Sequence, residues 1–105
     1  MTVHDWLLDS DPALRWQVLA DLTDAAPEVV ATERARVATE GWGGRLLALR
    51  GDDGQWAGGA CFPGDFRGDF SHGQPWTATL HTLQLLRDLG VDPNAQPVRD
   101  AIAAV

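Results

Sequence analysis

The second half of this chain contains the residues whose types could together bind a metal ion. Sulfur, nitrogen and carboxylate donors of the kinds found in zinc sites occur there: Cys61, His72 and His81, with Asp65 or Asp69. The separations of 11 and 9 residues match no known closed site, so we predict that no metal is bound. The alternative is a buried structural cysteine with two solvated or hydrogen-bonded histidines. The chain has no phosphate-binding loop and no nucleophile motif, and we predict no cofactor.

The aromatic residues suggest binding rather than catalysis. Phe62, Phe66 and Phe70 are spaced by four residues. They lie in the 25-residue segment 51–75, which contains seven glycines and no pattern for a regular element longer than a turn. We expect either an ordered surface loop pinned by its rings, or a lid over a pocket or a loop that docks a partner.

Five tryptophans stand near the ends of the predicted elements: Trp6, Trp16, Trp42, Trp56 and Trp76. A tryptophan brings a large apolar ring and one N–H donor, which suits packing at the junctions of stacked helices. The alternative is a ligand platform that Trp56 and Trp76 form with the phenylalanine loop.

Helices must position these side chains, and the sequence predicts helices on both sides of the loop. Ser10 or Asp11 can cap a helix with Pro12 in its first turn, where the missing amide hydrogen costs nothing. The next helix begins at Pro27 and should end at Gly41, and its apolar stripe is thin, so it should be outermost. Arg36 can pair at its surface with Glu33 and with Glu40. The predicted helices span residues 3–8, 12–25, 27–40, 43–50 and 77–89, followed by a last amphipathic stretch marked by Val98, Ile102 and Val105.

The helix predicted at residues 77–89 is apolar around most of its circumference. Its polar residues, Thr77, His81, Gln84 and Asp88, fall on one narrow strip. We therefore expect this helix to be buried on most sides, with the strip facing either solvent or a wet cavity. His81 and Gln84 are the strip residues that would contact a ligand in such a cavity.

Composition and charge disfavour several classes of function. The chain has fifteen acidic residues and eight arginines, and its net charge of −7 disfavours nucleic acids and anionic membrane surfaces as partners. No run reaches the ~18 to 20 apolar residues of a membrane span, so we expect none. The N-terminus lacks the basic region of a secretion signal, and the single cysteine, Cys61, cannot form an intrachain disulfide. We expect a cytoplasmic protein.

The region from residue 45 to residue 90 has a characteristic order of turns and helices. An apolar helix end is followed by a Gly-Asp-Asp-Gly turn and a Gln-Trp-Ala-Gly-Gly loop, and a second helix opens with Pro-Trp-Thr and closes with Leu-Gly. This order resembles that of the α,α-toroid proteins related to squalene cyclases and protein prenyltransferases. The matching positions are Asp53, Gly54, Gln55, Trp56, Gly58 and Gly59, then Trp76, Thr77, Thr79, Leu83, Leu86, Leu89 and Gly90.

The resemblance implies an all-α fold of helical hairpins of the α,α-toroid type, with one long loop rich in Gly, Asp and Phe. In that family an outer helix ends in the acidic turn, a Gln-Trp loop crosses the barrel end, and an inner helix follows. A closed toroid needs more helix pairs than 105 residues supply, so we expect residues 1–105 to be a single helical domain that self-associates or belongs to a larger parent chain. The terminal stripe of Val98, Ile102 and Val105 is the expected surface for self-association.

The catalytic motifs of these families are missing. Class II terpene cyclases protonate their substrate with an Asp-x-Asp-Asp cluster, and class I enzymes hold magnesium with a DDxxD run. Here only Asp52-Asp53 is present, within the turn. The zinc proteins of the superfamily use Asp-x-Cys or Cys-His patterns, and neither occurs around Cys61. The resemblance therefore implies an architecture and leaves catalysis by this chain open.

We predict a helical module that binds an apolar small molecule or a peptide in a groove lined by Trp and Phe. The predicted binding residues are Trp56, Phe62, Phe66, Phe70, Trp76, His81 and Gln84. One alternative is a portion of an enzyme of the terpenoid-cyclase or prenyltransferase type, whose acid lies in other sequence. Another is a protein-interaction scaffold of the HEAT kind, suggested by the pattern Asp-Pro-x-Leu-Arg-x-x-Val-Leu at residues 11–19.

Overall fold

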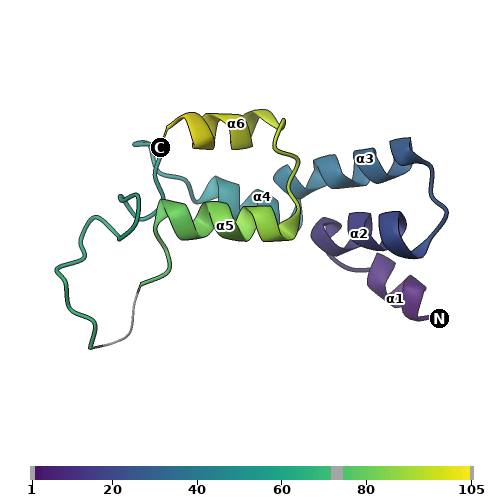
Figure 1. The fold of residues 1–105 in the computed structure, drawn as a ribbon, viewed down its shortest axis with the longest axis horizontal. Helices are drawn as coiled ribbons and strands as arrows, with labels where there is room; N and C mark the ends of the chain where they lie inside the picture. Colours follow the sequence, from purple (N-terminus) through teal and green to yellow (C-terminus); the bar gives the residue numbers. More distant parts are fainter. Residues whose placement is uncertain (1, 72–74, 105) are drawn as a thin grey trace.

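The structure, a computed structural model, describes residues 2–71 and 75–104, and every regular element in these residues is a helix (Figure 1). The predicted all-α fold is therefore confirmed. The elements are α1 (Val3–Leu8), α2 (Pro12–Leu22), α3 (Pro27–Ala35), the 3-10 helix η1 (Arg36–Ala38), α4 (Gly41–Ala48), α5 (Thr79–Leu89) and α6 (Gln96–Ala103). No helix in the described part of the chain is both long and apolar enough to cross a membrane.

Local capping signals explain where several helices begin and end. The Asp11 carboxylate accepts a hydrogen bond at 2.9 Å from the backbone N–H two residues later, and Pro12 takes the first position of α2. At the start of α1, the Thr2 hydroxyl accepts the Asp5 backbone N–H while the Asp5 carboxylate accepts the Thr2 backbone N–H. Gly90 adopts the left-handed conformation (φ 76°) after α5, which confirms the predicted end of that helix.

Other boundaries differ from those predicted. Helix α2 stops at Leu22 rather than residue 25, because Thr23 adopts an extended backbone and its hydroxyl donates back to the Leu19 carbonyl at 2.7 Å. Helix α4 begins at Gly41 rather than residue 43. Helix α5 begins at Thr79 rather than residue 77. The first two N–H groups of α5, which have no partner within the helix, donate to carbonyl groups of the long loop.

The helices form an elongated plate. Its extents are 50 × 30 × 17 Å, and its radius of gyration is 16.0 Å against about 13 Å for a compact chain of this length. Helices α1–α3 occupy one end, α4–α6 the middle, and the long loop the other end (Figure 1). The thinnest dimension is only 17 Å, and much of each helix faces water.

One carboxylate links the two groups of helices. The second oxygen of Asp11 accepts the backbone N–H of Trp42 at 2.7 Å, so this side chain caps both α2 and α4. Gly41, with a φ of 59°, makes the approach possible, since a Cβ there would lie 2.0 Å from the Asp11 carboxylate oxygen. Asp11 therefore fixes the start of α4 against the start of α2.

A second contact holds the end of α5 against α2 and α3. The Trp16 indole N–H donates to the Leu89 carbonyl at 3.3 Å, and Arg34 Nε donates to the Gly90 carbonyl at 2.9 Å. The Arg34 guanidinium also lies 4.9 Å from the centroid of the Trp16 ring. A cation at the last carbonyl groups of a helix is favourable, because the helix dipole is negative there.

The hydrophobic core lies where α4, α5 and α6 meet the start of the loop. Trp56 and Leu86 are buried there with Val98 and Ala101 of α6. Val98 therefore belongs to the core of its own chain, which corrects its predicted place in an intermolecular stripe. Ile102 of that stripe is exposed, and Val105 lies outside the described residues.

Helix α5 is less buried than predicted. Leu80 and Leu85 are 45% and 46% exposed, although both belong to its broad apolar surface. At 3.6 residues per turn their directions differ by about 140°, so α5 is open to solvent on two separate sides. The expectation that α5 is covered on most sides therefore fails within a single chain.

Helix α3 is also different from the surface helix predicted. Glu33 is only 8% exposed, and its carboxylate forms ion pairs with Arg15 of α2 and, at 2.7 Å, with Arg36. The predicted Arg36–Glu40 pair is present at 3.7 Å and is more exposed. The Arg15–Glu33 ion pair therefore links α2 to α3 through a nearly buried carboxylate.

Candidate functional site

The Gln55-Trp56 pair joins the loop to three helices. The Trp56 indole N–H donates to the Leu46 carbonyl of α4 at 2.8 Å, and its backbone N–H donates to the Thr79 hydroxyl of α5 at 2.9 Å. The Thr79 hydroxyl donates to Gln55 Oε1 at 2.6 Å, and Gln55 Nε2 donates to the Ala104 carbonyl after α6 at 3.2 Å. Since Trp56 is 3% exposed, its two hydrogen bonds satisfy N–H donors that water does not reach. Trp56 thus lies in the core, and its ring does not line an open groove.

The Asp52-Asp53 turn has a structural role. The Asp53 carboxylate accepts the Gln55 backbone N–H at 2.9 Å, and the Gly51 N–H donates to the Gln55 carbonyl at 2.8 Å. Arg50 Nε closes the turn by donating to the Gly54 carbonyl at 3.0 Å. Both carboxylates are exposed to solvent. The acidic turn therefore presents Gln55 and Trp56 to the helices.

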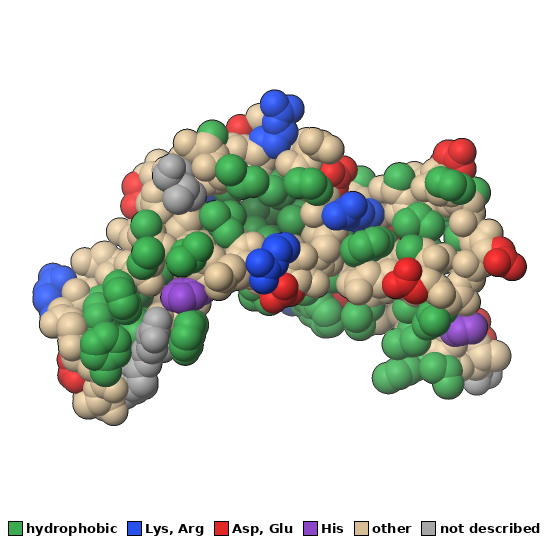
Figure 2. Space-filling model, in the orientation of Figure 1, with side chains coloured by type: hydrophobic (Ala, Val, Ile, Leu, Met, Phe, Trp, Pro, Cys, Tyr) green, Lys and Arg blue, Asp and Glu red, His purple; other side chains and the backbone are tan. Residues whose placement is uncertain are grey.

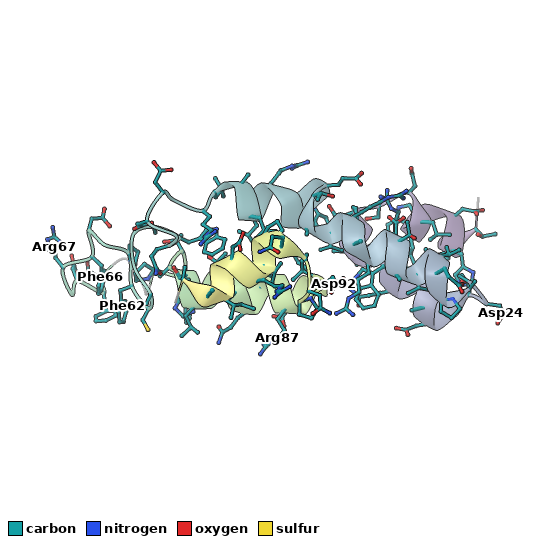
Figure 3. All side chains as sticks on the ribbon, turned by 90° about the horizontal axis from the view of Figure 1, so that it is seen from above. Asp24, Phe62, Phe66, Arg67, Arg87 and Asp92 are labelled. Carbon is teal, nitrogen blue, oxygen red and sulfur yellow. The ribbon has the colours of Figure 1, made fainter. Side chains whose placement is uncertain are left out.

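The three phenylalanines of the loop pack against one another. The rings of Phe62 and Phe66 stack with centroids 4.9 Å apart, and the Phe70 ring meets them edge to face at 6.3 and 5.3 Å. Phe62 and Phe70 remain exposed. Figure 3 shows Phe62 and Phe66 on the same side of the plate as Arg87 of α5. The structure thus brings together three of the predicted binding residues and leaves apolar surface on them.

Backbone contacts hold the loop that carries these rings. The N–H groups of Thr79 and Leu80 donate to the carbonyl groups of Gly59 and Ala60 at 3.0 and 2.8 Å. Farther along, the Ser71 backbone N–H donates to Asp69 at 2.9 Å and holds the pKa of that carboxyl below its usual value. Within the described residues, 51–71 and 75 contain no helix or strand, as predicted.

The remaining predicted binding residues lie at the start of α5 and along it. Trp76 is exposed and meets the half-buried His81 edge to face, with ring centroids 4.6 Å apart. Gln84 and Asp88 are exposed. The strip expected to face solvent or a wet cavity therefore opens to solvent at these two residues, while His81 is covered by the Trp76 ring.

A groove that the sequence did not single out runs between α5 and α6. It encloses about 280 Å³ and is lined by Leu83, Leu86, Val91, Pro93, Val98 and Ile102, with the arginines Arg34 and Arg87. Figure 2 shows hydrophobic side chains gathered in the hollow between α5 and α6 and, on the same face, over the long loop. The apolar positions were visible in the sequence, but each was equally compatible with a closed core. Only the placement of α6 beside α5 reveals a groove.

The possible metal ligands are not gathered in the part of the chain that the structure describes. No three His, Cys, Asp or Glu side chains within residues 2–71 and 75–104 lie as a metal site requires. Cys61 is exposed, which corrects the expectation that it is buried. His72 lies outside the described residues, so the absence of a metal stays a prediction.

Comparison of the chain with protein-family models, with curated proteins and with solved structures finds no match. The resemblance to α,α-toroid proteins therefore stays a prediction from the sequence of the Gln-Trp region and the helix that follows it.

Proposed function

We propose that this chain is a helical binding module for an apolar small molecule or peptide, built from hairpins of the α,α-toroid type. The observation that carries the proposal is the groove between α5 and α6, whose lining is apolar apart from Arg34 and Arg87. Small-molecule sites are typically concave and mostly apolar, with a few polar groups that orient the ligand. The two guanidinium groups are the polar groups available for that purpose here.

The aromatic loop extends the same binding face. Exposed rings of Phe62 and Phe70 lie on a loop that is tied to the first turn of α5, and hydrophobic side chains cover both the loop and the groove on one face (Figure 2). A ligand longer than the groove would therefore contact the phenylalanine cluster with its other end. Trp76 and His81 lie at the start of α5, between the loop and the groove in the sequence.

The Gln55-Trp56 pair supports the toroid part of the proposal. In the family that the sequence resembles, a Gln-Trp loop crosses the end of the barrel between an outer and an inner helix. Here the same two residues hydrogen-bond to α4, to α5 and to the end of α6. On this basis α4 would be the outer helix and α5 the inner helix of one hairpin.

The test is binding of N-phenyl-1-naphthylamine, an uncharged apolar dye that fluoresces when it leaves water. We expect saturable binding that weakens about tenfold in Ile102→Ser and in Phe66→Ala, because each removes apolar contact worth on the order of 1.5 kcal/mol. Leu22→Ser is the matched control, since Leu22 is as exposed as Ile102 but lies at the end of α2. Gln84→Ala tests whether the ligand also follows the polar strip.

The helical circular dichroism of every variant must equal that of the wild type for the comparison to hold. The groove and the aromatic loop are not the binding face if neither Ile102→Ser nor Phe66→Ala weakens binding. The same conclusion follows if Leu22→Ser weakens binding as much as they do.

A further inference from the structure

A second apolar groove lies between α4 and α5, on a side of α5 that α6 does not cover. Leu86 faces α6 and is buried with Val98, whereas Leu85, the preceding residue, is 46% exposed. The groove encloses about 390 Å³ and is lined by Trp42, Arg45, Leu46, Leu49, Leu85 and Leu89. Leu49, at the end of α4, is 72% exposed. The lining of this groove combines Trp, Leu and Arg. Trp and Arg are enriched among the residues that dominate binding energies at protein interfaces.

The area exposed by this chain is large enough for a missing interface. Its accessible surface is 6736 Å², whereas a compact protein of 11.3 kDa exposes about 5,700 Å². The excess of about 1,000 Å² is comparable to the ~800 Å² that each partner buries in a standard interface. A partner that covers the α4–α5 groove would therefore lower the exposed surface of the chain to about that of a compact protein of the same mass.

The charges around the groove are complementary to each other. Arg45, on α4, makes no hydrogen bond or ion pair within the described residues, although it lines an otherwise apolar groove. Asp88 lies on α5 three residues after Leu85, hence beside it on the helix surface. Its only ion pair in the described part of the chain is with the adjacent Arg87, at 3.3 Å and exposed. A surface with Arg45 on α4 and Asp88 beside Leu85 on α5 carries opposite charges that two copies can exchange.

Two-fold symmetry supplies that pairing. Helices α4 and α5 run in opposite directions beside each other (Figure 1). A two-fold rotation that packs α4 of one copy on α5 of the other brings each Arg45 towards the Asp88 carboxylate of the other copy. In such an interface the same surface is used twice, and every contact occurs in duplicate.

We propose that the face formed by Trp42, Leu49, Leu85 and Leu89 is the interface of a homodimer of this chain. This face is separate from the groove between α5 and α6, so the proposal goes beyond the proposed binding function. It also replaces the terminal stripe predicted for self-association, because Val98 of that stripe is used inside its own chain.

Sedimentation velocity of the 105-residue chain over a range of concentrations up to several hundred micromolar tests the interface. We expect a dimer for the wild type and a monomer for Leu85→Glu. Leu80→Glu is the matched control, because Leu80 lies on the same helix with nearly the same exposure but points in another direction. It should remain dimeric, with helical circular dichroism unchanged in both variants. A wild type that stays monomeric, or a Leu80→Glu variant that dissociates as readily as Leu85→Glu, would overturn the proposal.

A charge exchange tests the two-fold arrangement and does not depend on apolar packing. Arg45→Asp and Asp88→Arg should each weaken dimerisation about tenfold, since each change places like charges together twice in the dimer. The double variant restores opposite charges and should return the dissociation constant to near that of the wild type. Single variants that dimerise like the wild type, or a double variant as weak as the singles, would contradict the pairing of α4 with α5.

Discussion

Gly90 lies against the indole ring of Trp16, so close that a Cβ on residue 90 would be 2.2 Å from Trp16 Cζ2. Glycine is needed here for two independent reasons, the left-handed φ of 76° and the contact with the ring. The same indole donates its N–H to the Leu89 carbonyl. The contact therefore fixes the end of α5 on α2.

We predict that Gly90→Ala destabilises the protein by about 2 to 4 kcal/mol, from left-handed strain together with the clash against Trp16. Gly68→Ala is the control, because Gly68 has a φ of 84° but no described atom within 4 Å of the added Cβ. That variant should lose only about 1 kcal/mol. Urea unfolding of both variants gives the comparison, and equal losses would mean that the ring contact contributes nothing.

Thr79→Val should cost about 1 to 3 kcal/mol of folding free energy, because the buried Trp56 backbone N–H loses its acceptor. Thr79→Ser keeps the hydroxyl and should be close to the wild type. Chemical denaturation followed by helical circular dichroism measures both. A valine variant as stable as the wild type would show that the Trp56 N–H does not depend on this hydroxyl.

Replacing Glu33 by Gln should destabilise by about 1 to 3 kcal/mol, because two guanidinium groups lose their shared, nearly buried carboxylate. Glu40→Gln removes the longer and more exposed ion pair of Arg36 and should change stability by no more than about 0.5 kcal/mol. Thermal unfolding in low and high salt separates the two. A Glu33 variant as stable as the Glu40 variant would show that the α2–α3 hairpin does not depend on this cluster.

The stability of α1 should depend on pH because the Asp5 carboxylate caps this helix. Hydrogen bonds from Thr2, chiefly its backbone N–H and then its hydroxyl, hold the pKa of Asp5 below its usual value. A lowered pKa in the folded state means that the contribution is present above the ordinary pKa and is lost as the pH falls through the folded value. Carboxyl NMR titration should find the midpoint of Asp5 below that of an ordinary aspartate. Thr2→Ala should raise it only in part, because the backbone N–H of residue 2 remains as a donor, and a midpoint unmoved by that change would exclude the Thr2 hydroxyl as a cause.

The sequence predicted the helices well where their signals are local. Pro12 with its aspartate cap and Gly90 act within one turn of their own helix, so their effect does not depend on the rest of the fold. Glu33 is the opposite case, because its partner Arg15 is 18 residues away and only the packing of α3 on α2 reveals that the carboxylate is buried. Spacing along the helix predicted the pairs of Arg36 with Glu33 and Glu40, and both are present.

The candidate site was predictable in part for the same reason. The four-residue spacing of Phe62, Phe66 and Phe70 drew attention to rings that do meet. The α5–α6 groove depends on Leu83 and Ile102, which are far apart in the sequence, and no short-range pattern places them together. For Trp56 the sequence left packing at a helix junction and a place in a ligand platform both open, and only the bonds to the Leu46 carbonyl and the Thr79 hydroxyl show that it lies in the core.

The 17 Å thickness of the plate has a thermodynamic consequence. Both the denaturant dependence of the unfolding free energy and the heat-capacity change scale with the surface that becomes exposed on unfolding. A plate hides less surface than a sphere of equal mass, so its unfolding transitions should be broad for a chain of 105 residues. Pairing of two plates adds hidden surface, which would steepen the transition and raise its midpoint with protein concentration. The steepness of the unfolding transition therefore measures how much surface the folded molecule buries in solution.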